Sequence, residues 1–131
     1  MASIRKEVMV NARPEKVWAA VRDVGAVHES LAPGFVVDTR MEEGARVVTF
    51  ANGQVARELI VDVDDAAHRL VWAVVGRPRL THHNASLQVF AEGERRCRIV
   101  WIADLLPNEV AGYMQGMIEQ GMGVMKQTPE K

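Results

Sequence analysis

The stretch from Pro107 to Lys126 combines a helical apolar pattern with several glycines. Its apolar side chains recur at steps of three and four, which predicts one stripe along a helix about 28 Å long. Each glycine costs about 0.8–1 kcal/mol relative to alanine, so this helix can persist only by packing against another element. Pro107 suits a first helical turn, and Pro129 is expected to stop the helix. The stripe consists of Val110, Met114, Met117, Ile118, Met122 and Met125, and the glycines are Gly112, Gly116, Gly121 and Gly123.

Methionine dominates this stripe, and its flexible side chain fits two roles. It fills irregular gaps in a core, and it also adapts to the varied contents of a cavity. The pattern alone leaves both roles open. The glycines fit either if they let the helix lie close to a sheet or bend as a ligand enters.

Strand-like segments occupy most of the remaining chain. Residues 3–11 predict a first strand, Pro14 opens a helix with Val17, Trp18, Val21 and Val24 on its apolar face, and residues 26–31 form a short helix at most. Short turns then separate six strands, and Asn52-Gly53 is the strongest hairpin signal. Neighbouring strands joined by such turns pair antiparallel, so the fold class is α+β. These strands are residues 35–41, 46–50, 54–63, 69–75, 82–90 and 95–105.

Length and charge limit the function classes. A chain of 131 residues predicts a single domain, 1–131, with a sizeable core. The net charge of -1 argues against nucleic acid as a partner. One cysteine, Cys97, excludes an internal disulfide and is expected to be a buried, inert thiol. We find no secretory signal pattern and no apolar run long enough to span a membrane, and we therefore expect a cytoplasmic protein.

The strand at residues 69–75 is apolar on both faces. Val71, Ala73 and Val75 oppose Leu70, Trp72 and Val74, and Val100 and Ile102 add apolar side chains to the outer face. This pattern is compatible with a homodimer contact or with cover from the N-terminal segment.

Several stretches together resemble the polyketide cyclase/dehydrase-like branch of the START-like (SRPBCC) superfamily. They are Ala-Arg-Pro-Glu-Lys-Val-Trp at 12–18, Val-Ala-Arg-Glu-Leu-Ile-Val-Asp at 55–62, His-Arg-Leu-Val-Trp at 68–72, His-His-Asn-Ala-Ser at 82–86 and Cys-Arg-Ile-Val-Trp-Ile-Ala-Asp-Leu-Leu-Pro at 97–107. The resemblance implies a helix-grip fold of order β-α-α-β6-α. In it a curved seven-stranded antiparallel sheet grips the C-terminal helix around a deep apolar cavity. Members of this superfamily bind lipids, hormones, polyketides or other hydrophobic small molecules, and a few act on them. The superfamily shares no catalytic set that could be assigned here.

Alternation along the strands predicts which side chains face that helix. Trp72, His83 and Trp101 fall on the inward face of their strands. His83 and Tyr113 are the expected polar contacts to a ligand. The expected walls are Trp72, Trp101, Met114, Met117 and Met122.

Other candidate chemistry is weaker. His82 and His83 point to opposite faces of a strand and cannot chelate one ion, so no metal and no cofactor are expected. Glu58 and Asp62 share one face of their strand, and we expect that face to be solvated with Leu59 inward. If the register is reversed, Glu58 becomes a cavity carboxylate and the best candidate for a general base.

Three functions follow from these patterns. The leading hypothesis is the binding of a small hydrophobic molecule between the sheet and the last helix. The first alternative is an enzyme of the polyketide cyclase/dehydratase type that moves protons with His83 or Glu58. The second alternative is a structural or protein-interaction domain whose core is filled by its own side chains.

Overall fold

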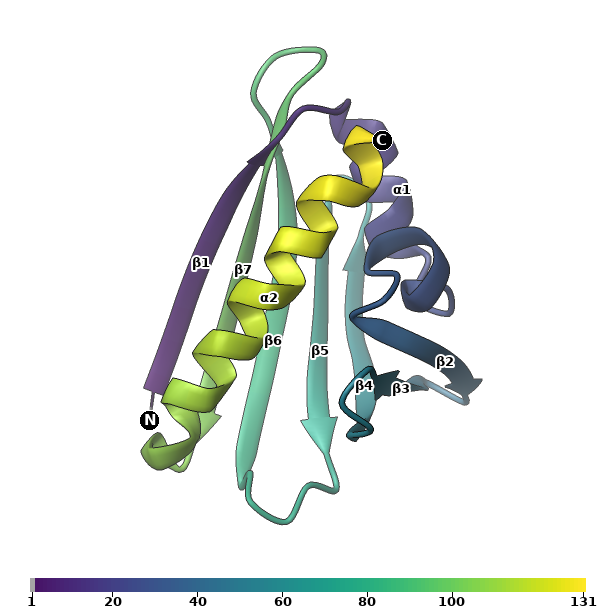
Figure 1. Cartoon of the computed structure of the whole chain (residues 1–131). Coiled ribbons are helices and arrows are strands. Elements are labelled where there is room, and N and C mark those ends of the chain that lie inside the picture. Colours follow the sequence, from purple (N-terminus) through teal and green to yellow (C-terminus); the bar gives the residue numbers. More distant parts are fainter. Residues whose placement is uncertain (1) are drawn as a thin grey trace.

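The computed structural model describes residues 2–131 and shows one curved antiparallel sheet with a long helix across its concave side (Figure 1). The seven strands run in the order β1-β7-β6-β5-β4-β3-β2. This arrangement confirms the predicted α+β helix-grip fold and its order of elements. The strands are β1 Ala2–Val10, β2 Val36–Glu42, β3 Ala45–Phe50, β4 Val55–Asp64, β5 Arg69–Val75, β6 His82–Ala91 and β7 Cys97–Leu106. The helices are α1 Pro14–Arg22, the π-turn η1 Val27–Leu31, the 3-10 turn η2 Asn108–Val110 and α2 Ala111–Glu130.

The β3–β4 hairpin turns at Asn52-Gly53, as predicted. Gly53 has a φ of +88°, a conformation that glycine adopts at little cost. Phe50 N donates to Gln54 O at 2.8 Å, and this pairing fixes the register of the two strands. The register places Arg46 directly opposite Glu58.

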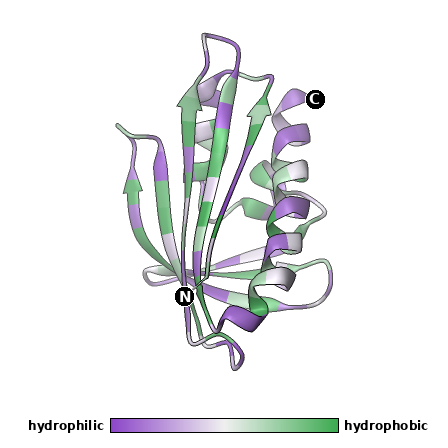
Figure 2. Ribbon diagram, turned by 90° about the vertical axis from the view of Figure 1, so that its left-hand side faces the viewer, coloured by the Kyte–Doolittle hydropathy of each residue, from purple (hydrophilic) through white to green (hydrophobic). Residues whose placement is uncertain are grey.

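The core lies between the concave face of the sheet and α2. The apolar and polar bands alternate along the strands, as the hydropathy colouring makes visible (Figure 2). Trp72, His83 and Trp101 all face inward, which confirms the predicted alternation. The buried side chains that meet here include Leu70, Trp72, Val74, Ala85, Leu87, Val89, Ile99, Ala103, Leu105, Ile118, Met122 and Met125.

Hydrogen bonds and a ring stack hold α1 against the β4–β5 turn. Trp18 Nε1 donates to Oδ1 of Asp65 at 2.9 Å, and Arg22 Nε donates to the same oxygen at 2.7 Å. The Trp18 ring also stacks on His68, with 5.4 Å between ring centroids. α1 ends at Arg22, so Val24 lies in the following turn rather than on the helix as predicted.

The expected stop at Pro129 is wrong, because α2 continues through Pro129 to Glu130. Its last turn is held from outside the helix. Lys16 Nζ donates to the Pro129 carbonyl at 2.9 Å, and the backbone N–H of Asn11 donates to the Glu130 carboxylate at 2.8 Å. These contacts stabilise the last turn and so offset the backbone hydrogen bond that is lost because Pro129 has no N–H. Among residues 2–131, no helix is long and apolar enough to cross a membrane.

The outer face of the sheet offers less apolar surface than the sequence suggests. Val71 and Val100 are only 7% and 4% exposed, because side chains of the same chain shield them. Neither residue is therefore available to a second copy, and the homodimer stays a prediction.

One glycine of α2, and not all four, permits a close approach. A Cβ atom added at Gly121 would lie 3.0 Å from Phe35 Cε2 and 3.1 Å from Trp101 Cζ3. A Cβ atom at Gly112, Gly116 or Gly123 would have no neighbour within 4 Å among the residues described. The idea that all four glycines bring helix and sheet together is therefore wrong for three of them.

Alanine substitutions should separate these two kinds of glycine. Gly116→Ala should raise the free energy of unfolding by about 0.5–1 kcal/mol, because alanine favours the helix and meets no neighbour. Gly121→Ala should lower it by about 1 kcal/mol or more, because the new methyl group must displace the buried Phe35 ring and the partly buried Trp101 ring. Urea denaturation measures both values. Equal stabilisation by the two substitutions would contradict the close packing at Gly121.

Candidate functional site

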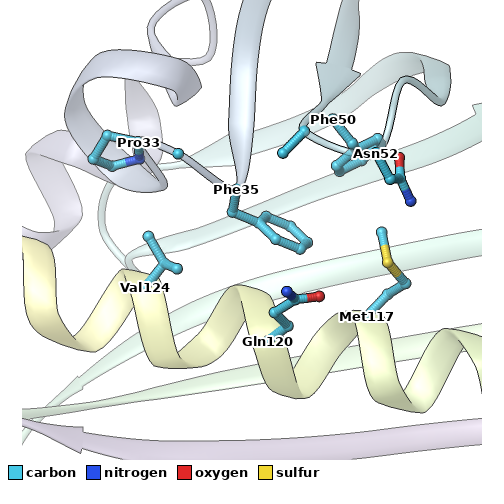
Figure 3. A pocket seen from close by; sticks show the side chains of 9 residues that line it. Pro33, Phe35, Phe50, Asn52, Met117, Gln120 and Val124 are labelled. Carbon is cyan, nitrogen blue, oxygen red and sulfur yellow. The ribbon is translucent and has the colours of Figure 1, made fainter.

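Four neighbouring pockets lie in and around the space between the sheet and α2. The hairpin pocket, of about 280 Å³, opens between the segment before β2, the β3–β4 hairpin and α2. In Figure 3, the Phe35 ring points from the segment before β2 toward α2, near Gln120 and Met117. Its lining residues are Pro33, Gly34, Phe35, Phe50, Ala51, Asn52, Met117, Gln120 and Val124.

Two inner pockets lie deeper and are small. The first inner pocket, of about 50 Å³, and the second inner pocket, of about 40 Å³, share Phe35, Phe50, Glu58, Trp72 and Trp101 in their walls. A drug-sized ligand needs about 300–1,000 Å³. The single deep cavity that the family resemblance implies is therefore replaced in this conformation by two narrow spaces.

The loop pocket, of about 350 Å³, opens at the β5–β6 loop and the start of α2. It shares Gln54, Arg77, Tyr113 and Met114 with the second inner pocket. Side chains rather than backbone thus separate the loop pocket from the interior. Its lining is Gln54, Arg77, Arg79, Leu80, Glu109, Val110, Tyr113 and Met114.

The structure brings most of the predicted ligand-binding residues together. The second inner pocket is where they meet, and Met122 is the exception, since it packs in the core at 4% exposure and lines none of the four pockets. Contact of these residues with a ligand stays a prediction. The predicted residues in this wall are Trp72, His83, Trp101, Tyr113, Met114 and Met117.

Two polar atoms in this wall have no hydrogen-bond partner among residues 2–131. They are His83 Nδ1 and Trp101 Nε1, and both are buried. Burial, together with the positive charges of Arg77 and His82, lowers the pKa of His83 to about 4. The imidazole is therefore neutral at pH 7 and has one nitrogen that accepts a hydrogen bond and one that donates.

Glu58 faces inward, so the expectation that Leu59 points inward and Glu58 to solvent is wrong. Arg46 Nε lies 2.7 Å from Glu58 Oε1, and the two side chains are only 4% and 9% exposed. The pairing of β4 with β5 shifts by one residue between Ile60 and Asp62. This bulge breaks the alternation, which is why Asp62 is exposed although Glu58 is buried.

Arg46 is a buried charge that the sequence analysis missed. Its Nη1 donates to Val24 O at 3.4 Å, and its guanidinium lies 5.4 Å from the centre of the Trp72 ring. No direct signal for it is present in the sequence. Counting back from a two-residue Asn52-Gly53 turn sets Arg46 opposite Leu59. The observed loop is one residue longer, with Phe50 N bonded to Gln54 O, and this shift sets Arg46 opposite Glu58. With its carboxylate bonded to Arg46, Glu58 is less suited to act as a general base than the sequence suggested.

A chain of exposed hydrogen bonds joins the β3–β4 hairpin to α2. Tyr113 Oη donates to Gln54 Oε1 at 2.9 Å, and Asn52 Nδ2 donates to Tyr113 Oη at 3.3 Å. Arg77 Nη2 donates to the same Gln54 oxygen at 3.1 Å. These bonds cross the boundary between the second inner pocket and the loop pocket.

Histidine and cysteine are not arranged for metal chemistry in the described chain. His82 is exposed on the outer face, opposite to His83. Within residues 2–131, no three His, Cys, Asp or Glu side chains gather closely enough to hold a metal ion. Burial raises the pKa of the Cys97 thiol to about 11, so this cysteine is protonated at pH 7.

Removing one partner of the Arg46–Glu58 pair should be far more costly than removing both. Glu58→Leu should lower the free energy of unfolding by about 3–5 kcal/mol, because Arg46 is left as an unpaired buried charge. The double variant Arg46→Met/Glu58→Leu should recover most of that loss. Urea denaturation of the wild type, both single variants and the double variant tests this coupling. Additive losses would mean that the two charges do not depend on each other.

His83 should make the protein less stable in acid. Its folded pKa lies below the unfolded value of about 6.5, so only the unfolded chain takes up this proton between about pH 6.5 and pH 4. The contribution of neutral His83 to the free energy of unfolding is therefore fully present above pH 6.5 and is lost as the pH approaches 4. Between pH 7 and pH 4.5 the wild type should lose about 2–3 kcal/mol more than His83→Gln, measured by urea denaturation. An equal loss in both proteins would show that His83 titrates normally.

Solved structures of other proteins share this fold. Among solved structures, XoxI from Bacillus cereus has a TM-score of 0.89 at 16% identity, with 100% of this chain and 97% of that chain covered. A protein from Thermobifida fusca has a TM-score of 0.76 at 28% identity, with 93% and 85% covered. The Zhui aromatase/cyclase from Streptomyces sp. R1128 has a TM-score of 0.72 at 16% identity, with 98% and 93% covered.

These likenesses establish the shared fold. A search of curated proteins finds no significant match. The family model described as "Polyketide cyclase / dehydrase and lipid transport" matches residues 1–130, nearly the whole chain. The chain therefore belongs to the polyketide cyclase/dehydrase and lipid transport family.

Proposed function

We propose that this protein binds a small hydrophobic molecule between the sheet and α2. The observation that carries the proposal is the pair of buried, unpartnered polar atoms, His83 Nδ1 and Trp101 Nε1, in a wall otherwise rich in rings and methionines. A core that served only for packing should leave few such atoms unpaired. A ligand oxygen could accept a hydrogen bond from the Trp101 N–H, and His83 could donate or accept one. The family description, which includes lipid transport, supports the same class of ligand.

Access to the inner pockets requires side-chain movement. Phe35 and Phe50 line the hairpin pocket and both inner pockets, and Met117 lines the hairpin pocket and the second inner pocket. A new rotamer of Phe35 would join these spaces without moving a strand. Removing roughly 200 Å² of apolar ligand surface from water contributes about 5 kcal/mol, which exceeds the cost of one unfavourable rotamer.

Uptake of the uncharged dye N-phenyl-1-naphthylamine tests the proposal. The wild type should increase dye fluorescence with a saturable affinity. Met117→Trp should weaken that affinity by about tenfold or more, because the larger ring fills the passage between the hairpin pocket and the second inner pocket. Gln115→Trp is the matched control, since Gln115 is exposed on the same helix and lines none of these pockets.

The absence of saturable dye uptake by the folded wild type would overturn the proposal and favour a domain that acts through a protein partner. Equal uptake by both tryptophan variants would place the bound dye elsewhere. The ligand itself can then be identified by mass spectrometry of organic extracts of protein purified from its native host.

An enzyme that transfers a proton through His83 is the second candidate function. It is favoured by the imidazole Nδ1 of His83, which within residues 2–131 lies unpartnered in the wall of the second inner pocket. With a pKa of about 4 this imidazole is a weak base, so binding of the substrate would have to raise the pKa for efficient proton transfer near pH 7. The Zhui structure is an aromatase/cyclase, which agrees with such chemistry in a related fold. Turnover of a polyketide-like substrate that disappears in His83→Gln would support this candidate. Full turnover in that variant would exclude His83 as the acid or base.

A further inference from the structure

The loop pocket contains two arginines that lack a carboxylate partner. Arg77 and Arg79 both line it, and within residues 2–131 neither forms a salt bridge. The one acidic side chain in this wall is Glu109, which is exposed. Arg46, by contrast, is neutralised by Glu58. The positive charge of the loop pocket is therefore free for an external anion.

Arg77 occupies the boundary between the loop pocket and the interior. It is half-buried and lines both the loop pocket and the second inner pocket. Within residues 2–131 its guanidinium makes one hydrogen bond, to Gln54 Oε1, so most of its five N–H donors are available. The Tyr113 hydroxyl donates to that same oxygen. Arg77 and Tyr113 thus already converge on one acceptor atom, which an incoming oxygen could replace.

The opposite wall of the loop pocket is apolar and leads inward. Leu80, Val110 and Met114 line it, and Met114 continues into the second inner pocket beside Met117. His83 lines the second inner pocket together with Arg77 and Met114. A neutral imidazole next to the passage allows an apolar chain to enter without meeting a second charge.

We propose that the loop pocket binds the carboxylate of an amphipathic ligand, with Arg77 as the principal contact and the ligand's apolar part directed toward Met114 and Met117. The planar guanidinium matches a carboxylate in a two-point hydrogen bond, and such charge-assisted bonds are the strong ones. Arg79 adds positive charge at the solvent side, and Tyr113 can donate to the second oxygen. This inference rests on the proposed function, since it names the ligand class of the same interior.

Competition between matched ligands tests the inference. Decanoate and decanol share one alkyl chain and differ in the head group, and each is titrated against bound N-phenyl-1-naphthylamine. Decanoate should displace the dye from the wild type at about a tenfold lower concentration than decanol. In Arg77→Gln the affinity for decanoate should fall about tenfold, whereas that for decanol should change less than about twofold. Arg95→Gln is the matched control, since it removes one exposed arginine that lines none of the pockets.

The outcomes separate this inference from the proposed function. If decanol and decanoate bind the wild type equally, the carboxylate site is wrong while hydrophobic binding stands. If decanoate is preferred but Arg77→Gln and Arg95→Gln behave alike, Arg77 is not the contact and the inference is also wrong. If the folded wild type binds neither the dye nor either ligand, the proposed function fails and this inference with it.

Discussion

The contact of α2 with Phe35 and Trp101 at Gly121 determines how closely the helix approaches the sheet. The glycine has no side chain, so two aromatic rings can come within 3.0 and 3.1 Å of the position that a Cβ atom would take. One ring comes from the segment before β2, which is one edge strand of the sheet. The other ring comes from β7, which lies next to the opposite edge. The helix is poor in intrinsic propensity, and this packing, together with the contacts of its last turn, compensates for its glycines. The same close approach leaves only small spaces in the interior.

The Arg46–Glu58 pair introduces charge into that narrow interior. Burying two charges costs desolvation free energy, and the attraction and hydrogen bonds between the two groups offset only part of that cost. The pair therefore contributes little net stability, but it makes any register of the β3–β4 hairpin that separates its members expensive. Arg46 also packs over Trp72 and reaches the Val24 carbonyl. It thus connects the hairpin to β5 and to the turn after α1, and it positions the wall that Trp72 contributes to both inner pockets.

Sequence patterns predicted the architecture because they report local physics. Alternation in β5, β6 and β7 placed Trp72, His83 and Trp101 inward, and Asn52-Gly53 set the hairpin, since both follow from backbone geometry. Glu58 was misplaced because a β-bulge beyond it breaks the alternation, and single-residue shifts leave no periodic trace. Pro129 was taken for a helix stop because the contacts that hold the last turn come from Asn11 and Lys16, far away in sequence. The division of the interior into small pockets depends on rotamers such as that of Phe35, which no pattern encodes.

The two openings of the interior differ in charge, and this difference would orient a ligand. The hairpin pocket is bordered by Pro33, Phe35 and Val124 and contains no charged side chain among its lining residues. The loop pocket contains Arg77 and Arg79. An amphipathic molecule that spans the interior therefore has one favourable direction, with its apolar end toward Phe35 and its anionic end toward Arg77. In that direction the hydrophobic and the electrostatic contributions to the binding free energy add. In the reverse direction the anionic group would lose its water among aromatic rings and gain no positively charged partner. The neutral state of His83 fits the same orientation, because it places a hydrogen-bonding group rather than a charge in the second inner pocket, which Phe35 and Arg77 also line.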